Sequence, residues 1–278
     1  MKLFRICCFL LVAVVLLASA CNLKPERSLI LATTTSTYDS GLLDVIIPLF
    51  EEENNVKVRV IAVGTGQALA LGARGDADVV LVHAPQKEEQ FVADGFGVDR
   101  TYVMYNDFVV LGPPDDPAGI KGLGSVAEAF RRIAETRSTF ASRGDESGTH
   151  TKEMRLWAEA GIDSPEDEDW YKSLGQGMGG TLTTANEMRA YTLSDRGTYL
   201  ARTKLDLVVL TEGDEMLFNP YHVMIVNPEK FPNVQAELAR LFVDFLLSEE
   251  TRQAINEFGR DKYGQGLFTP VDVRSTGE

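Results

Sequence analysis

The chain is organised around one polar stretch, residues 142–153, which reads Ser142-Arg143-Gly144-Asp145-Glu146-Ser147-Gly148-Thr149-His150-Thr151-Lys152-Glu153. Arg143 offers a planar fork of donors, and Ser147 and Thr149 offer hydroxyl groups. Gly148 lets a ligand approach the backbone, and the helix expected from Thr149 onward begins with unpaired N–H groups. These groups predict a site that binds a small tetrahedral oxyanion and releases it unchanged. Taken alone, the stretch also fits an ordinary polar loop with an internal ion pair and a helix cap.

Upstream of this stretch, the order strand, polar turn, helix repeats. The short apolar run 29–32 leads into the hydroxyl run 33–37, and the alternating run 56–62 leads into a small polar turn at Thr65. A third apolar strand ends at His83. This order predicts an α/β fold with mostly parallel sheets. Ligands bind at the carboxyl ends of strands in such sheets, so the hydroxyls form a second group of candidate donors. That group consists of Thr34, Thr35, Ser36 and Thr65. The alternative is that the run only caps a helix, although one residue would suffice.

Two long apolar runs divide the chain into two lobes. The run 102–111 leaves the first lobe, and the run 218–228 returns to it. We therefore expect lobe I over 29–108 and 222–278 and lobe II over 109–221. Two crossings between lobes that both carry donors predict a cleft that closes by a hinge.

The N-terminus predicts export. Lys2 and Arg5 precede an apolar run and small residues, so we expect residues 1–20 to be a signal peptide. Cys21 follows at once and resembles the lipid-modified cysteine of bacterial lipoproteins, with 21–28 as a tether. Cleavage to a soluble secreted form is the alternative. We expect the protein in the periplasm or lipid-anchored on the outer face of the cytoplasmic membrane. The mature chain would have no disulfide, because Cys21 is its only cysteine.

Charge and motifs exclude other classes of function. With 41 acidic and 27 basic residues, the net charge of −14 argues against a nucleic-acid partner, and an anion site must work through local contacts. A hydrolase that uses Ser147 and His150 is the alternative class, but the chain has neither a Gly-x-Ser-x-Gly motif nor metal-ligand spacing. The glycine-rich segment 175–180 lacks a phosphate-loop lysine, and Thr181 after it is either a further ligand donor or a helix cap. We expect no catalysis and no cofactor.

Several motifs, in the same order, resemble the tungstate-binding proteins of bacterial tungstate ABC importers. They are Thr33-Thr34-Thr35-Ser36-Thr37-Tyr38-Asp39-Ser40-Gly41-Leu42-Leu43, Val63-Gly64-Thr65-Gly66-Gln67-Ala68-Leu69, Gly75-Asp76-Ala77-Asp78-Val79-Val80-Leu81-Val82-His83-Ala84, the stretch 142–153 and Asp195-Arg196-Gly197-Thr198-Tyr199. The resemblance covers nearly all of the expected mature chain. It implies a class II periplasmic-binding-protein fold: two α/β lobes, two crossover strands and a ligand in the cleft. It also implies an importer permease as partner, and we expect a monomer.

The resemblance also implies roles for individual residues. In lobe I, Thr34, Thr35, Ser36 and Thr65 would donate to the anion. In lobe II, the side chains of Arg143, Ser147 and Thr149 would donate together with the amide of Gly148. Asp145 would orient Arg143 rather than contact the ligand.

His83 is the position that separates this chain from phosphate-binding proteins, which it resembles more distantly. Those proteins have an aspartate there, which accepts the proton of phosphate and repels fully ionised anions. His83 removes that like charge and adds a ring N–H. The alternative is that His83 only packs at the end of a strand. The residues themselves leave molybdate, sulfate and phosphate open as ligands, because tungstate and molybdate have nearly the same size and charge.

Overall fold

A computed structural model describes residues 27–271, so the predicted signal peptide over 1–20 and the predicted lipidation site Cys21 lie outside the described residues. In this range the strands are β1 (Ser28–Thr34), β2 (Lys57–Val63), β3 (Val79–Val82), β4 (Gly97–Gly112), β5 (Phe140–Ser142), β6 (Tyr171–Ser173), β7 (Thr192–Asp195), β8 (Val208–Thr211), β9 (Phe218–Val226) and β10 (Thr269–Pro270). The helices are α2 (Thr35–Asp39), α3 (Leu42–Asn54), α4 (Thr65–Arg74), α5 (Pro85–Ala93), α6 (Val126–Glu135), α7 (Gly148–Glu159), α8 (Met178–Met188), α9 (Arg196–Leu200), α10 (Ala236–Leu247), α11 (Glu249–Glu257) and α12 (Arg260–Tyr263), with 3-10 turns η1 (Pro165–Asp167) and η2 (Glu215–Leu217).

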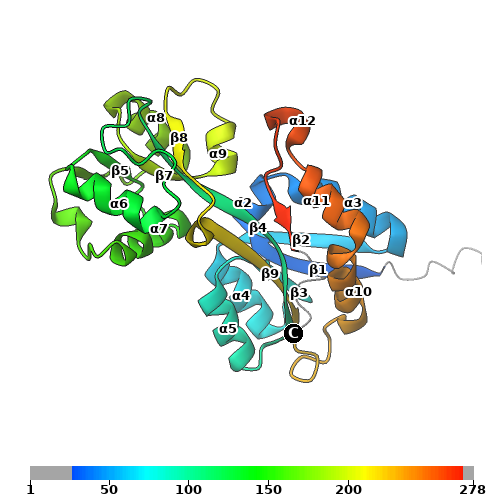
Figure 1. Cartoon of the computed structure of the whole chain (residues 1–278). Coiled ribbons are helices and arrows are strands. Elements are labelled where there is room, and N and C mark those ends of the chain that lie inside the picture. Colours follow the sequence, from blue (N-terminus) through cyan, green and yellow to red (C-terminus); the bar gives the residue numbers. More distant parts are fainter. Residues whose placement is uncertain (1–26, 272–278) are drawn as a thin grey trace, which may run out of the picture.

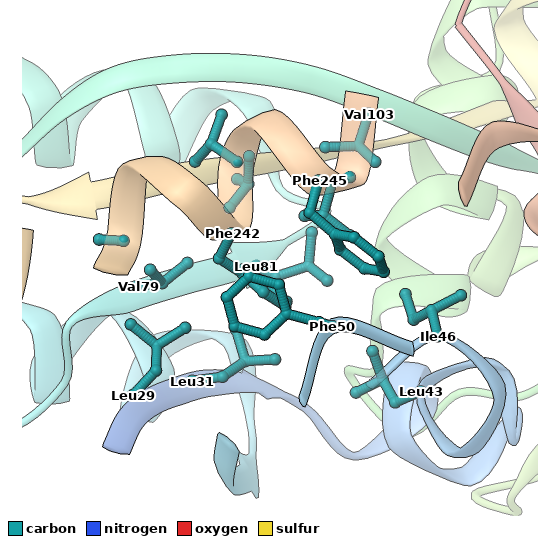
Figure 2. Packing of buried hydrophobic residues seen from close by; sticks show 14 of the residues in the cluster. Leu29, Leu31, Leu43, Ile46, Phe50, Val79, Leu81, Val103, Phe242 and Phe245 are labelled. Atoms are coloured by element: carbon teal, nitrogen blue, oxygen red, sulfur yellow. The ribbon is translucent and has the colours of Figure 1, made fainter. Parts of the chain in front are cut away.

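The first group of elements is a sheet with the strand order β10-β4-β9-β3-β1-β2. Strands β1, β2 and β3 run parallel, whereas β9 pairs antiparallel with both β3 and β4. Alternate side chains of the buried strands point to opposite faces. Leu29, Leu31 and Leu81 pack on one face with α3 and α10, and Val80 and Val82 pack on the other with α4 and α5. Figure 2 shows the first of these two clusters, with Phe50 between the strands and Phe242.

The second group of elements is built on the far half of β4. There, β4 pairs antiparallel with β7 and β8, and β5 pairs in parallel with β6. Phe130, Phe140 and Trp157 are fully buried and their rings contact one another, which joins α6, β5 and α7. This packing fixes the strand and the helix on either side of residues 143–147.

Strands β4 and β9 link the two groups (Figure 1). Strand β4 pairs with β9 as far as Asp107, which lies opposite Phe218, and it pairs with β7 from Phe108 onward. The α/β class with two crossover strands is confirmed. The crossing strands add an antiparallel part to the sheet, because β9 returns alongside β4. None of the helices between residues 27 and 271 has the length and apolar character needed to cross a membrane.

Candidate functional site

The hydroxyl run after β1 forms a compact cluster in lobe I. Thr34 is the N-cap of α2, and its Oγ1 accepts a hydrogen bond of 3.2 Å from the amide of Thr37. The same oxygen lies 2.6 Å from Thr37 Oγ1 and 3.1 Å from Ser36 Oγ. Thr35 and Ser36 are exposed, whereas Thr33 is buried and its hydroxyl donates to the carbonyl of Leu81. The run therefore contains buried hydroxyls that bond to the protein itself and hydroxyls that face the solvent. This division arises because successive side chains of a strand point to opposite faces and because a helix begins at Thr35.

Thr65 lies at the same edge of the sheet. It is the first residue of α4 and follows Val63, which pairs with Thr34 in the parallel ladder. The carboxyl ends of β1 and β2 therefore bring Thr65 and the Thr34 cluster to adjacent positions, as the sequence predicted.

His83 belongs to the same cluster. Its Nε2 lies 3.2 Å from both Thr34 Oγ1 and Ser36 Oγ, and its Nδ1 lies 3.2 Å from Asn219 Oδ1. The Nδ2 of Asn219 donates to Asn106 at 2.8 Å, so the side chain of Asn219 turns its oxygen toward the imidazole. Burial lowers the pKa of His83, which favours the neutral ring.

The neutral ring of His83 has only one N–H, and Asn219 Oδ1 is its acceptor. Nε2 therefore has a lone pair, which accepts a hydrogen bond from one of the two hydroxyls. The sequence predicted an additional N–H donor for the ligand at this position. The structure instead directs that N–H to the crossing strand β9. Sequence reasoning missed Asn106 and Asn219, because their contact with His83 depends on strand register and no motif marks it.

Residues 143–147 form the corresponding loop of lobe II, between β5 and α7. One carboxylate oxygen of Asp145 accepts from Arg143 Nε at 3.1 Å and Nη2 at 2.5 Å, and the other accepts from the amide of Ser147 at 3.2 Å. Arg143 Nη1 lies 3.5 Å from Thr149 Oγ1. Burial alone would raise the pKa of Asp145, but the hydrogen bonds from Ser147 and Arg143 hold this pKa below its usual value. The carboxylate therefore stays ionised and orients the guanidinium.

The loop ends at the start of α7, where Ser147 is the N-cap and its Oγ accepts from the amide of His150 at 3.3 Å. Gly148 and Thr149 open the helix, whose first N–H groups have no partner within the helix. A Cβ at Gly148 would meet no atom within 4 Å, so the space beside its backbone is open. His150 Nδ1 accepts from the amide of Glu146 instead of contacting Ser147 Oγ. This arrangement suits an anion and does not form a nucleophile–base pair.

A buried carboxylate lies below this loop and was not predicted. Glu153 Oε2 accepts from Ser142 Oγ at 2.9 Å, and Ser142 Oγ accepts from the amide of Gly144 at 3.1 Å. Glu153 Oε1 accepts from Tyr171 at 2.7 Å and from Trp157 at 3.3 Å. Burial raises the pKa of Glu153 to about 7, and these three donors limit the rise. The network holds the start of the loop against the second turn of α7.

Thr181 is placed differently from the other candidates. It is fully buried in the first turn of α8, and its hydroxyl lies 3.3 Å from the carbonyl oxygens of both Gln176 and Gly177. The hydroxyl therefore donates back to carbonyl oxygens about one turn earlier, whereas the N-cap of α8 is Gly177, so the capping role considered for Thr181 is wrong.

Residues 22–250 match the family described as PBP superfamily domain. The chain is 50% identical over 250 residues to the tungstate-binding protein TupA of Peptoclostridium acidaminophilum, covering 89% of this chain and 87% of the relative.

Two solved structures are similar over most of their length. The tungstate-binding protein TupA from Desulfovibrio alaskensis G20 superposes with a TM-score of 0.84 at 46% identity and covers 88% of this chain and 99% of its own. The tungstate ABC transporter structure from Geobacter sulfurreducens has a TM-score of 0.71 at 56% identity, covering 83% of this chain and 98% of its own.

Proposed function

The chain belongs to the PBP superfamily and, within it, to the family of tungstate-binding proteins of ABC transporters, and we propose that it captures tungstate between its lobes for an ABC importer. Members of this family bind and deliver a solute, so the expectation that the chain is not an enzyme is confirmed. The protein acts outside the cytoplasm, as solute-binding proteins of importers do.

The observation that carries this proposal is the arrangement of Arg143, Asp145 and Ser147 at the start of α7. The guanidinium is held by one carboxylate oxygen, and the other oxygen of that carboxylate holds the amide of the N-cap. Arg143 Nη1, Thr149 and the first amides of the helix remain to donate hydrogen bonds. These donors match the oxygens of a tetrahedral dianion, and their fixed positions reduce the ordering that binding requires.

The donors of lobe I complete the proposed site. On binding, the hydroxyl that donates to His83 Nε2 would turn its hydrogen to the anion, so that Thr34 Oγ1 and Ser36 Oγ both donate, together with Thr35 and with Thr65 from the next strand end. In lobe II, Arg143, Ser147, Thr149 and the Gly148 amide would donate. Neutral donors share most of the ligand charge, as in other preorganised oxyanion sites.

His83 supports a fully ionised ligand. At this position a carboxylate would add a negative charge beside the Thr34 hydroxyl, and it would favour anions that carry a proton. The neutral ring offers a lone pair without a formal charge, so its repulsion of tungstate is much weaker. We therefore place His83 in the site as a neutral group that tolerates a dianion.

We also propose that Cys21 carries the lipid anchor and that the protein acts as a monomer with the importer permease as its partner. Mass analysis of the mature protein from the membrane fraction tests the anchor, with Cys21→Ser as the control. We expect the mass of the wild-type protein to include the lipid and the mass of Cys21→Ser to lack it. A wild-type protein without added lipid mass would overturn the proposed anchor.

The function itself is tested by calorimetric titration of the signal-free protein with tungstate, molybdate, sulfate and phosphate at neutral pH. Tight one-to-one binding of tungstate that Arg143→Ala abolishes is the expected result. Binding of phosphate without tungstate would contradict both the ligand assignment and the role given to His83. If none of the four anions bound, the proposed function would be wrong.

A further inference from the structure

The proposed site as described so far provides almost no net positive charge. Arg143 is its only cation, and the carboxylate of Asp145 lies 2.5 Å from the guanidinium. The pair is close to neutral as a unit, and His83 is neutral as well. A dianion enclosed between two lobes loses much of its hydration, so a nearby positive charge that is not already paired would strengthen its binding beyond what the neutral donors supply.

Lys152 on α7 is a cation of this kind. Its side chain is partly buried, and its Nζ donates to the backbone carbonyl of Phe218 at 2.9 Å and lies 5.9 Å from the centre of the Phe108 ring. It forms no ion pair with any carboxylate in residues 27–271. An ammonium group taken from water without a counter-ion is unfavourable, so this arrangement suggests that an anion completes it.

The position of Lys152 in the fold connects it to both halves of the site. It follows Thr149 by three residues on α7, and side chains with this spacing lie on one face of a helix. Phe218, which accepts its hydrogen bond, is the first residue of the crossing strand β9. The next residue, Asn219, holds His83 in lobe I. Lys152 is therefore fixed where the anion helix of lobe II meets the strand that supports the donors of lobe I.

We propose that Lys152 is a further residue of the anion site and supplies the unpaired positive charge for the bound dianion. This inference rests on the proposed function and deepens it. One N–H of the Lys152 ammonium group donates to the carbonyl of Phe218 at the crossing strands. The other two N–H groups of the ammonium would face the ligand. In this arrangement, the fixed guanidinium of Arg143 orients the anion, and the ammonium group of Lys152 provides the net positive charge.

The titration of Lys152 agrees with this role. Burial and, to a smaller extent, the charge of Arg155 on the same helix lower its pKa to about 8, and the charge of Asp214 before η2 limits this fall. A bound dianion would stabilise the ammonium form. Tungstate affinity should therefore be constant below the free pKa and should fall as pH rises through about 8.

The experiment is a calorimetric titration of the wild type, Lys152→Gln and Lys152→Arg with tungstate between pH 7 and 9.5. Lys172→Met is the matched control, because Lys172 is an exposed lysine of the same lobe that also donates to a backbone carbonyl, that of Asp169. We expect Lys152→Gln to weaken binding roughly 10- to 100-fold at pH 7 and to remove the fall above pH 8. Lys152→Arg should bind within a few fold of the wild type and show no fall, because arginine does not titrate in this range.

Wild-type affinity in Lys152→Gln, or an unchanged pH profile in that variant, would overturn the proposal. Equal losses in the Gln and Arg variants would also overturn it, since only packing would then matter. Thermal unfolding of each variant separates loss of fold from loss of binding. If the wild type binds molybdate or sulfate instead of tungstate, the proposed ligand is wrong, and the same series with that dianion still tests Lys152. If no dianion binds, both proposals fail.

Discussion

Asp145 contacts Arg143 along one edge of the guanidinium only. A single carboxylate oxygen accepts from Nε and Nη2, while Nη1 points toward Thr149 at 3.5 Å. The carboxylate thereby fixes the plane of the guanidinium and leaves its other edge available. An arginine held in this way loses little side-chain freedom when an anion binds, which is the physical advantage of orienting it in advance.

Two substitutions test this relationship. Arg143→Lys keeps the charge but removes the fork, and we expect it to lose at least one charge-assisted hydrogen bond, equivalent to about 1.5–3 kcal/mol or a roughly 10- to 150-fold weaker tungstate affinity. Asp145→Asn keeps the size of the side chain and should weaken binding less, through a looser Arg143. Calorimetry gives both values. Equal affinities for the wild type and Arg143→Lys would show that the planar fork is not needed.

Ser147 caps α7 and is also a proposed ligand donor, and Ser125 offers a matched control. Ser125 caps α6 in the same way, with its Oγ accepting from the amide of Glu128 at 3.3 Å. Each serine-to-alanine change should lower the free energy of unfolding by about 1 kcal/mol. Only Ser147→Ala should also weaken tungstate binding. Urea unfolding and calorimetry separate the two effects, and unchanged affinity in Ser147→Ala would remove this residue from the site.

Gly144 lies in the loop 143–147 and Gly148 begins the helix that follows it, and the two positions have different reasons to be glycine. Gly144 has a φ of +58°, and an added Cβ would lie 2.0 Å from Ser173 Oγ, so Gly144→Ala should destabilise the protein by about 1–3 kcal/mol. Gly148 has open space around its backbone, so Gly148→Ala should retain the melting temperature and reduce tungstate affinity. Full affinity in Gly148→Ala would mean that the ligand does not approach this amide closely.

His83 should control which oxyanions are tolerated. We expect His83→Asp to bind tungstate at least roughly tenfold more weakly than the neutral variant His83→Asn, because a carboxylate beside Thr34 and Ser36 would face the dianion. Protonated phosphate should lose less affinity than tungstate in His83→Asp. Competition titrations with both anions measure the ratio of tungstate affinity to phosphate affinity in each variant. If this ratio were the same in His83→Asp and His83→Asn, position 83 would not determine the selectivity between the two anions.

Glu153 predicts an unusual dependence of stability on pH. Its pKa in the folded protein is about 7 against an ordinary value of 4.5, so its contribution to stability is complete below about pH 4.5 and is lost as pH rises through 7. The wild type should therefore lose about 3 kcal/mol relative to Glu153→Gln between pH 4.5 and 8. Urea unfolding at several pH values measures this difference, with Glu159→Gln, an exposed change at the end of the same helix, as the control. Parallel curves for the wild type and Glu153→Gln would contradict the prediction.

Much of the fold could be predicted because its signals are local. The apolar run Val79–Val82 between polar turns is the central strand, and the glycines and hydroxyls after β1 and β2 mark strand ends. A helix after the polar stretch could be predicted from Thr149 onward, and α7 begins one residue earlier, at Gly148. The motif-level resemblance added the ligand class, which composition could not provide.

Other parts of the site could not be predicted, because they depend on contacts between residues that are distant in the chain. Asn219 meets His83 only because β3 pairs with β9, and Lys152 meets Phe218 only because α7 packs at the crossing strands. The direction of the His83 N–H follows from the first contact. For Thr181, the start of α8 at Met178 places the hydroxyl against the carbonyls of the preceding turn, so this residue does not cap the helix.

The sequence by itself therefore determined the order of the elements and the types of donor in the proposed oxyanion site, since hydrophobic period, turns and caps act over a few residues. The tertiary structure decided which ring nitrogen of His83 carries the hydrogen, which carboxylate lies below the loop, and that Lys152 has no carboxylate partner among residues 27–271. Those properties depend on burial and on strand register, and both arise only when distant segments pack together.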